Sequence, residues 1–234
     1  ITPRFVPSCT SELMTGLAKL AKEYDVPVQS HLSENHGEID WVASLHPESS
    51  NYTDVYYEHH LMGTVPTVMA HCIHLSGVEM DRMADTQTMV SHCPYSNVNL
   101  SSGIAPIRKL IERNIPIGLG SDISGGHIVS MAKVLTEAIG LSKMKWVEVD
   151  QTYAPLTLSE AFYMATKGGG KFFGKVGSFE KGCELDALVI DDTALFDPNE
   201  RSLEERLERW LYVGDDRHIV ERYVAGKVAP EPMY

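Results

Sequence analysis

The chain has 234 residues, a hydrophobic fraction of 43% and a formal net charge of -12 at pH 7. Such a length and composition are typical of one large globular domain or two small ones. The acidic charge argues against nucleic acid as a partner, because a polyanion would be repelled and the sequence contains no basic run.

Hydrophobic periodicity predicts a series of helices in the first part of the chain. Residues 2–7 are expected to form a strand and a turn. Residues 11–24 then carry apolar side chains at i, i+3, i+4 and i+7, the spacing of an amphipathic helix. Similar patterning predicts helices at residues 34–45, 52–62, 76–84 and 104–113, with a polar loop at residues 94–103. Two further helices are expected at residues 128–144 and 158–172.

Short apolar runs alternate with these helices, and four of them end in a residue that can bind a metal or move a proton. The runs cover residues 26–31, 65–71, 88–92 and 115–122, and they end in His31, His71, His92 and Asp122. Alternation of strands and helices predicts an α/β fold with a parallel sheet. Because the C-terminal ends of parallel strands meet on one face, we expect these four side chains to converge.

The character of the sequence changes near Gly174. A turn-rich stretch is followed by expected strands at residues 185–190 and 219–224 and a charged helix at residues 203–211. We therefore divide the chain into residues 1–174, a strand–helix region, and residues 175–234, a smaller β-rich segment. A closed (β/α)8 barrel needs eight strands, and only five are predicted before the boundary, so the sheet is either open or part of a barrel.

His31 and Glu34 form an H-x-x-E pair in which the histidine ends a strand and the glutamate precedes a helix. A neutral imidazole is a good zinc ligand, and a nearby carboxylate can accept a proton from an attacking water. The alternative for Glu34 is a helix-opening residue favoured by the helix dipole. His71 is either a ligand or polarising group, or a core histidine bonded to the backbone.

His92, in the segment His92-Cys-Pro-Tyr-Ser-Asn97, is expected to support the site structurally. Asp122 follows two glycines, and is either a metal ligand and base or a helix N-cap. Arg4 can donate a fork of hydrogen bonds to a carbonyl and Phe5 can stack on a flat ring, although a surface arginine and a core phenylalanine are the simpler interpretation.

Several other chemistries are not supported by the sequence. It contains no Walker spacing, no dinucleotide-binding glycine fingerprint and no nucleophile elbow. The signature of cytidine-type zinc deaminases is also absent. The four cysteines show no C-x-x-C spacing, and no run of 18 apolar residues occurs, so we expect a cytoplasmic protein without a membrane span.

The motifs together resemble the C-terminal portion of the guanine deaminase family, within the amidohydrolase superfamily. The matching segments run along most of the chain: Pro3-Arg-Phe5, Gln29-Ser-His-Leu-Ser-Glu-Asn35, Asn51-Tyr-Thr-x-Val-Tyr56, Val68-Met-Ala-His71, His92-Cys-Pro-x-Ser-Asn97, Gly118-Leu-Gly-Ser-Asp122 with Gly125-Gly126, and Gly214-Asp-Asp-Arg217. The resemblance implies part of a TIM-type (β/α)8 barrel for residues 1–174, and part of a small β-sandwich domain for residues 175–234.

The resemblance also implies zinc-dependent hydrolysis of guanine to xanthine and ammonia. His31 and Asp122 match two metal ligands, Glu34 the proton shuttle and His71 the histidine that orients the attacking water. Arg4 and Phe5 match residues that bind the purine, and His31, Glu34 and Asp122 also face it. Iron is an alternative metal, since His and Asp ligands suit both. A homodimer is implied as well.

One departure from the family pattern concerns the metal. The family takes two more ligands from an H-x-H on the first barrel strand, and this sequence contains no H-x-H. Because the sequence also begins at Ile1, we expect a fragment that alone is a poor enzyme. Two other hypotheses stay open: a related deaminase acting on a pterin, triazine or adenosine-type substrate, and a non-catalytic scaffold.

Overall fold

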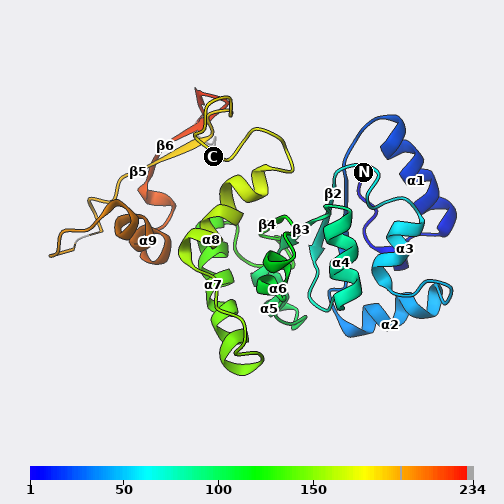
Figure 1. The fold of residues 1–234 in the computed structure, drawn as a ribbon. Coiled ribbons are helices and arrows are strands. Elements are labelled where there is room, and N and C mark those ends of the chain that lie inside the picture. The colour runs from blue at the N-terminus through cyan, green and yellow to red at the C-terminus, as the bar shows by residue number, and fades with distance from the viewer. Residues whose placement is uncertain (196, 231–234) are drawn as a thin grey trace.

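The computed structural model describes residues 1–195 and 197–230. Its centre is a four-stranded parallel sheet formed by β1 (Val28–Leu32), β2 (Thr67–His71), β3 (Met89–His92) and β4 (Ile117–Leu119). The strands lie side by side in chain order, and helices connect each to the next (Figure 1). The parallel sheet predicted from the alternating pattern is therefore confirmed.

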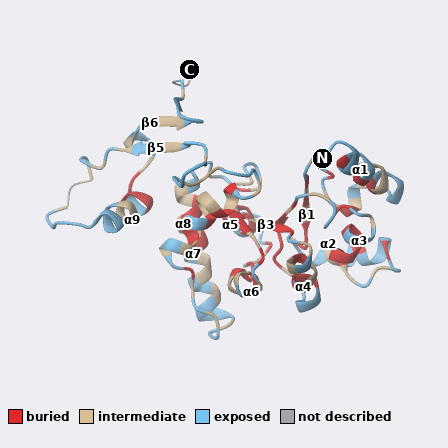
Figure 2. Cartoon of the chain, turned by 45° about the horizontal axis from the view of Figure 1, so that its top comes forward, coloured by how far each residue is buried: buried red, intermediate tan, exposed pale blue. Residues whose placement is uncertain are grey.

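The helices of this region pack around the sheet. In chain order they are α1 (Ser11–Glu23), α2 (His36–Leu45), α3 (Tyr52–Glu58), α4 (Gly77–Asp85), α5 (Pro94–Asn99), α6 (Ile107–Glu112), α7 (Met131–Glu148) and α8 (Leu158–Tyr163), with a π-helical turn at η2 (Met164–Gly168). Buried residues line the strands and the inward faces of these helices (Figure 2). In α1, for example, Met14, Ala18 and Ala21 are buried, as the predicted amphipathic spacing requires.

Two expectations for this region are wrong in detail. Residues 2–7 form no assigned strand; a short 3-10 turn, η1 (Val6–Ser8), follows an extended segment. That segment still runs beside β1, because the carbonyls of Ile1 and Arg4 accept hydrogen bonds from the backbone N–H groups of Gln29 and His31. The predicted loop at residues 94–103 contains α5, which Pro94 starts because its fixed φ suits the first helical turn.

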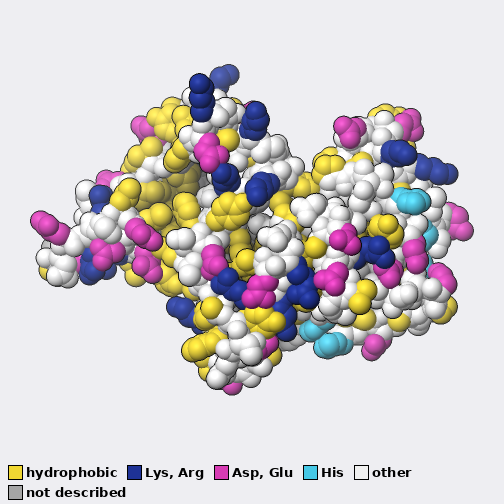
Figure 3. Space-filling model, viewed as in Figure 1, with side chains coloured by type: hydrophobic (Ala, Val, Ile, Leu, Met, Phe, Trp, Pro, Cys, Tyr) yellow, Lys and Arg dark blue, Asp and Glu magenta, His cyan; other side chains and the backbone are white. Residues whose placement is uncertain are grey.

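A second, antiparallel sheet follows, made of β5 (Ala187–Ile190), β6 (Ile219–Val224) and β7 (Lys227–Val228). Helix α9 (Leu203–Val213) packs on α7, where Lys133 donates to the carbonyls of Leu211 and Tyr212, and a 3-10 turn, η3 (Asp216–His218), leads into β6. Figure 3 shows hydrophobic side chains gathered on the side of the molecule that carries this sheet. No helix in the described part of the chain is both long enough and apolar enough to span a bilayer.

Candidate active site

The parallel sheet brings the predicted site residues to one edge. His31, His71 and His92 lie at the C-terminal ends of β1, β2 and β3, and Asp122 lies just beyond β4. The rings of His31 and His71 are stacked with centroids 5.2 Å apart. His71 Nε2 lies 3.8 Å from Glu34 Oε2 and 3.9 Å from Asp122 Oδ2. The structure thus groups two imidazoles and two carboxylates around one point.

The backbone of the first segment fixes the ring of His31. Its Nδ1 lies 2.6 Å from the carbonyl oxygen of Arg4. Because a carbonyl can only accept, the ring proton belongs on Nδ1 and the lone pair on Nε2. A metal-binding histidine is typically held in this way by a second hydrogen bond.

His71 is almost completely buried, with 1% of its surface exposed, and is held by a side chain from the helix that follows β3. Its Nδ1 lies 2.9 Å from Asn97 Oδ1 on α5. Since the amide oxygen can only accept, His71 donates from Nδ1 and turns its Nε2 toward Glu34 and Asp122. His71 is thus buried, as the core-histidine alternative predicted, but its ring bonds to a side chain and not to the backbone.

Glu34 reaches across the site and does not serve as a helix-opening residue. The N-cap of α2 is Asn35, whose side chain accepts from the backbone N–H of Glu38. Glu34 Oε1 instead accepts a hydrogen bond of 3.0 Å from Ser102 Oγ. Its carboxylate is 17% exposed, so it keeps access to solvent while Ser102 and His71 hold it in place.

Asp122 opens a tight turn after β4 instead of capping a helix. Its φ is 45°, and its carbonyl accepts from the backbone N–H of Gly126 at 2.6 Å. A side chain at Gly125 would place a Cβ 2.7 Å from Asp122 Oδ2 and 2.6 Å from Ser96 Oγ. Glycine is therefore required at position 125 for this carboxylate to keep its place.

His92 lies behind the site and is neutral at physiological pH. It is 1% exposed, and burial, with a smaller contribution from nearby His71, lowers its pKa to about 3. Its Nδ1 has no hydrogen-bond partner among the residues that the structure describes. The adjacent Cys93 is also buried, and burial raises the pKa of its thiol to about 12, which makes it a packing residue.

Arg4 and Phe5 contribute to the site in different ways. The main chain of Arg4 contacts His31, whereas its exposed guanidinium lies 5.1 Å from the centroid of the Phe5 ring. The edge of that ring meets Trp41 of α2 at a centroid distance of 6.2 Å. A cationic and an aromatic side chain of the segment that precedes β1 thus contact each other.

Three contacts in the site could not be found from sequence patterns. Ser102 and Asn97 hold Glu34 and His71 through hydrogen bonds that span 68 and 26 residues of sequence. His74 is half-buried, and its Nε2 lies 2.8 Å from the carbonyl oxygen of Ser102. The only signal in the sequence was the position of Asn97 in the His92–Asn97 motif.

A cavity of about 850 Å³ opens along one face of the parallel sheet. In β1 and β2 residues at alternate positions line it, Gln29 and His31 in one strand and Val68 and Ala70 in the other, and consecutive residues of β3 and β4 complete that face. Asp122 and the aromatic rings of Phe172 and Phe173 complete the wall. His31 and Asp122 therefore border a space large enough for a small molecule.

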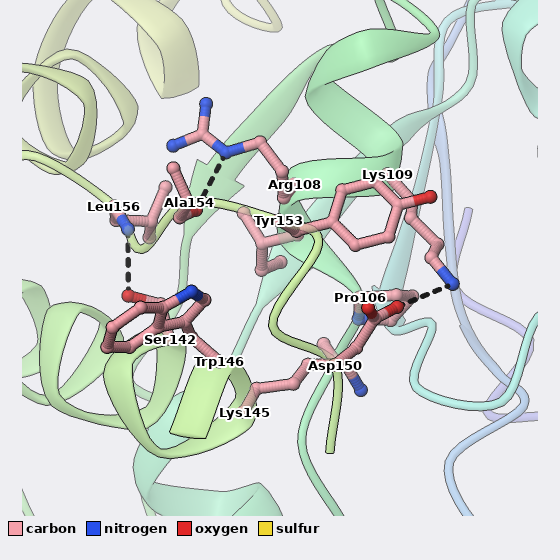
Figure 4. Close-up of a pocket in the computed structure, with 12 residues that line it drawn as sticks. Pro106, Arg108, Lys109, Ser142, Lys145, Trp146, Asp150, Tyr153, Ala154 and Leu156 are labelled. Carbon is pink, nitrogen blue, oxygen red and sulfur yellow. Dashed lines mark hydrogen bonds and ion pairs between the residues drawn. The ribbon is translucent and has the colours of Figure 1, made fainter. Parts of the chain in front are cut away.

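A much smaller pocket between α6 and α7 is unrelated to this cluster. It encloses about 30 Å³, room for about one water molecule, next to Trp146 and Tyr153 (Figure 4). Lys109 pairs with Asp150 across it at 3.5 Å. Its lining comes from residues 105–109 and 142–156, so it is separate from the strand-end site.

The donor set fits part of a zinc site. His31 and Asp122 offer an imidazole nitrogen and a carboxylate oxygen, both of which zinc accepts. Within the described ranges, however, no group of three or more histidine, cysteine or acidic side chains is arranged to hold a metal ion. His31 and Asp122 are therefore two residues that could bind a metal, with His71 and Glu34 close to them.

Comparison with known proteins identifies the family of the chain. The amidohydrolase family model matches residues 1–229. The chain belongs to the amidohydrolase family. A guanine deaminase of Dictyostelium discoideum is 43% identical over 97% of this chain, and one of Mus musculus is 40% identical over 97%. These alignments cover 51% and 52% of the relatives, so the chain spans about half the length of the curated relatives it matches.

Solved structures of this amidohydrolase's relatives share its fold. The guanine deaminase from C. acetobutylicum, with guanine bound in its active site, superposes with a TM-score of 0.94 at 54% identity, covering 97% of this chain and 54% of that one. An adenosine deaminase from Xanthomonas campestris with bound zinc superposes with a TM-score of 0.83 at 23% identity, covering 97% and 50%. The latter likeness shows the fold alone.

Proposed function

We propose that this chain carries part of a guanine deaminase, which converts guanine and water to xanthine and ammonia. The observation that carries the proposal is the grouping of Glu34, His71 and Asp122 at the strand ends, in a chain 54% identical to a guanine deaminase with guanine bound. The nearby cavity of about 850 Å³ supports a small purine substrate.

The proposed roles follow from the contacts of each residue. His31 and Asp122 would hold a zinc ion, which when bound lowers the pKa of the attacking water. Glu34, as a carboxylate with solvent access, takes a proton from that water and delivers it to the leaving amine. His71, whose Nε2 faces both carboxylates, orients the water. Arg4 and Phe5 bind the 6-oxo group and the face of the purine.

The domain assignment forms part of the same proposal. We assign residues 1–174 to a portion of a TIM-type barrel and residues 175–234 to part of a small β-sandwich domain. The four-stranded parallel sheet and the separate antiparallel sheet support this division. A homodimer and a zinc rather than an iron centre are proposed on the family resemblance alone.

The test incubates the purified chain with guanine and zinc and measures the formation of xanthine and ammonia. Because the chain spans half of its relatives, the assay should be repeated with the N-terminal half of a relative supplied in trans. Glu34→Gln should lower turnover by about 10²- to 10⁴-fold, the usual contribution of a proton-transfer group. Glu23→Gln, on the exposed end of α1, is the matched control and should leave turnover unchanged. Equal rates for Glu34→Gln and Glu23→Gln would contradict the assignment.

A second comparison tests the substrate. Arg4→Ala should weaken guanine turnover sharply, whereas Arg217→Ala, whose side chain is 83% exposed in the C-terminal segment, should have little effect. An unchanged guanine rate in Arg4→Ala, with deamination of a pterin, triazine or adenosine-type compound, would favour the alternative substrates. Failure of zinc to bind, both to the chain alone and to the chain supplied with the N-terminal half of a relative, would favour the scaffold hypothesis.

A further inference from the structure

We propose that helix α3 is a positioning element for the site, and that Tyr52, Tyr56 and Glu38 hold Glu34 and His31 in place through the backbone. The assignment of Glu34 as the proton carrier rests on the proposed function, but the positioning itself is a statement about structure. The motif Asn51–Tyr56 matched the family pattern without receiving any role. The contacts of α3 supply one.

The first connection runs from Tyr52 to Glu34. The Tyr52 hydroxyl donates to Glu38 Oε1 at 2.7 Å. The other oxygen of that carboxylate, Oε2, accepts from the backbone N–H of Glu34 at 2.9 Å. Because Glu38 is 7% exposed and Tyr52 is 3% exposed, solvent cannot easily replace either bond. The main chain from which the Glu34 side chain extends is therefore fixed by a buried carboxylate.

The second connection runs from Tyr56 to His31. The Tyr56 hydroxyl lies 2.8 Å from the carbonyl oxygen of His31, to which it donates, and 2.7 Å from Ser30 Oγ. Ser30 Oγ also lies 3.2 Å from the carbonyl oxygen of Arg4, the same oxygen that lies 2.6 Å from His31 Nδ1. Tyr56 thus contacts both the backbone of His31 and the network that orients its ring.

Sequence spacing explains how one short helix makes both connections. Tyr52 and Tyr56 are four residues apart, so they lie on the same face of α3, and their rings stack with centroids 5.6 Å apart. Burial raises the pKa of both phenols above the usual value, so both hydroxyls stay protonated and remain donors at working pH.

The other side of α3 is anchored to α4. Thr53 Oγ1 donates to Glu79 Oε1 at 3.1 Å, and Asp54 forms an ion pair of 3.2 Å with Arg82. Glu79 also caps the start of α4, the helix that follows β2 and His71. Helix α3 is therefore held against a rigid neighbour, as it must be to position a third segment.

The first experiment measures amide hydrogen exchange at Glu34 in the purified chain, and so does not depend on activity. Glu38→Ala and Tyr52→Phe should accelerate exchange of the Glu34 N–H, by about tenfold or more for Glu38→Ala, because its acceptor is removed. Glu38→Gln retains an acceptor oxygen and should restore protection. Tyr57→Phe, the same substitution on the exposed side of α3, is the matched control. Unchanged exchange at Glu34 in both Glu38→Ala and Tyr52→Phe would overturn the proposal.

The second experiment is a double-mutant cycle on guanine turnover. Tyr52→Phe should lower kcat by about tenfold with KM changed less than about twofold, since only the proton carrier is displaced. In a Glu34→Gln background, Tyr52→Phe should cause no further loss. Multiplicative losses would overturn the proposal, because Tyr52 would then act independently of Glu34. Absence of turnover in the unmodified protein, even with the N-terminal half of a relative supplied in trans, would count against the proposed function only, and the amide exchange result would still decide the positioning.

Discussion

The hydrogen bond between His71 and Asn97 gives the sharpest prediction for the stability of the site. Asn97→Ala removes the acceptor 2.9 Å from His71 Nδ1, where both residues are buried, with 1% and 0% of their surfaces exposed. Leaving a buried donor unpaired costs about 1–3 kcal/mol, and the lost amide volume adds to this. Because Asn97 Nδ2 has no partner among the described residues, removing it offsets part of the cost. We expect a net loss of about 1–3 kcal/mol.

Urea denaturation at pH 7, followed by circular dichroism, measures this loss. Asn97→Asp retains an acceptor and should recover much of the stability. Asn99→Ala, on the same helix but exposed, removes only a bond to the carbonyl of Gly125 and should cost less than about 1 kcal/mol. If Asn97→Ala and Asn99→Ala destabilise the protein equally, His71 does not depend on Asn97 and the reasoning is wrong.

Three further predictions follow from other contacts. The hydrogen-bonded ion pair with Arg108 lowers the pKa of Glu160 from 4.5 to about 2. Glu160→Gln should therefore lower the free energy of unfolding by about 1–3 kcal/mol at pH 7. The urea midpoints of the variant and the unmodified protein should converge as the pH falls from about 4.5 toward 2. Gly125→Ala should reduce zinc affinity, measured by titration, because the added Cβ would displace the carboxylate of Asp122. Ser102→Ala should lower kcat for guanine by about tenfold while the unfolding free energy changes by less than about 1.5 kcal/mol, since it removes one hydrogen bond to Glu34.

The sequence alone determined the strands and the chemistry at their ends. Apolar runs bounded by proline and glycine predicted the positions of β1 to β4. His31, His71 and Asp122 lie at or just beyond the ends of these strands. This worked because strand periodicity is a local property and alternation of strands with helices favours a parallel sheet, whose shared edge brings the strand ends together. The family motifs added the roles, which no spacing rule supplies.

Only the tertiary structure decided how these residues are held. Glu34 could have opened a helix or faced the site, and a contact with Ser102 68 residues away decides for the site. Residues 2–7 looked like a strand, but in the structure they pair with β1 without forming one. The predicted loop after His92 contains α5, because burial of Ser96 and Asn97 against the site outweighs their local preference for turns. These outcomes depend on packing between segments that are distant in sequence, and local sequence patterns carry no information about the energies of such packing.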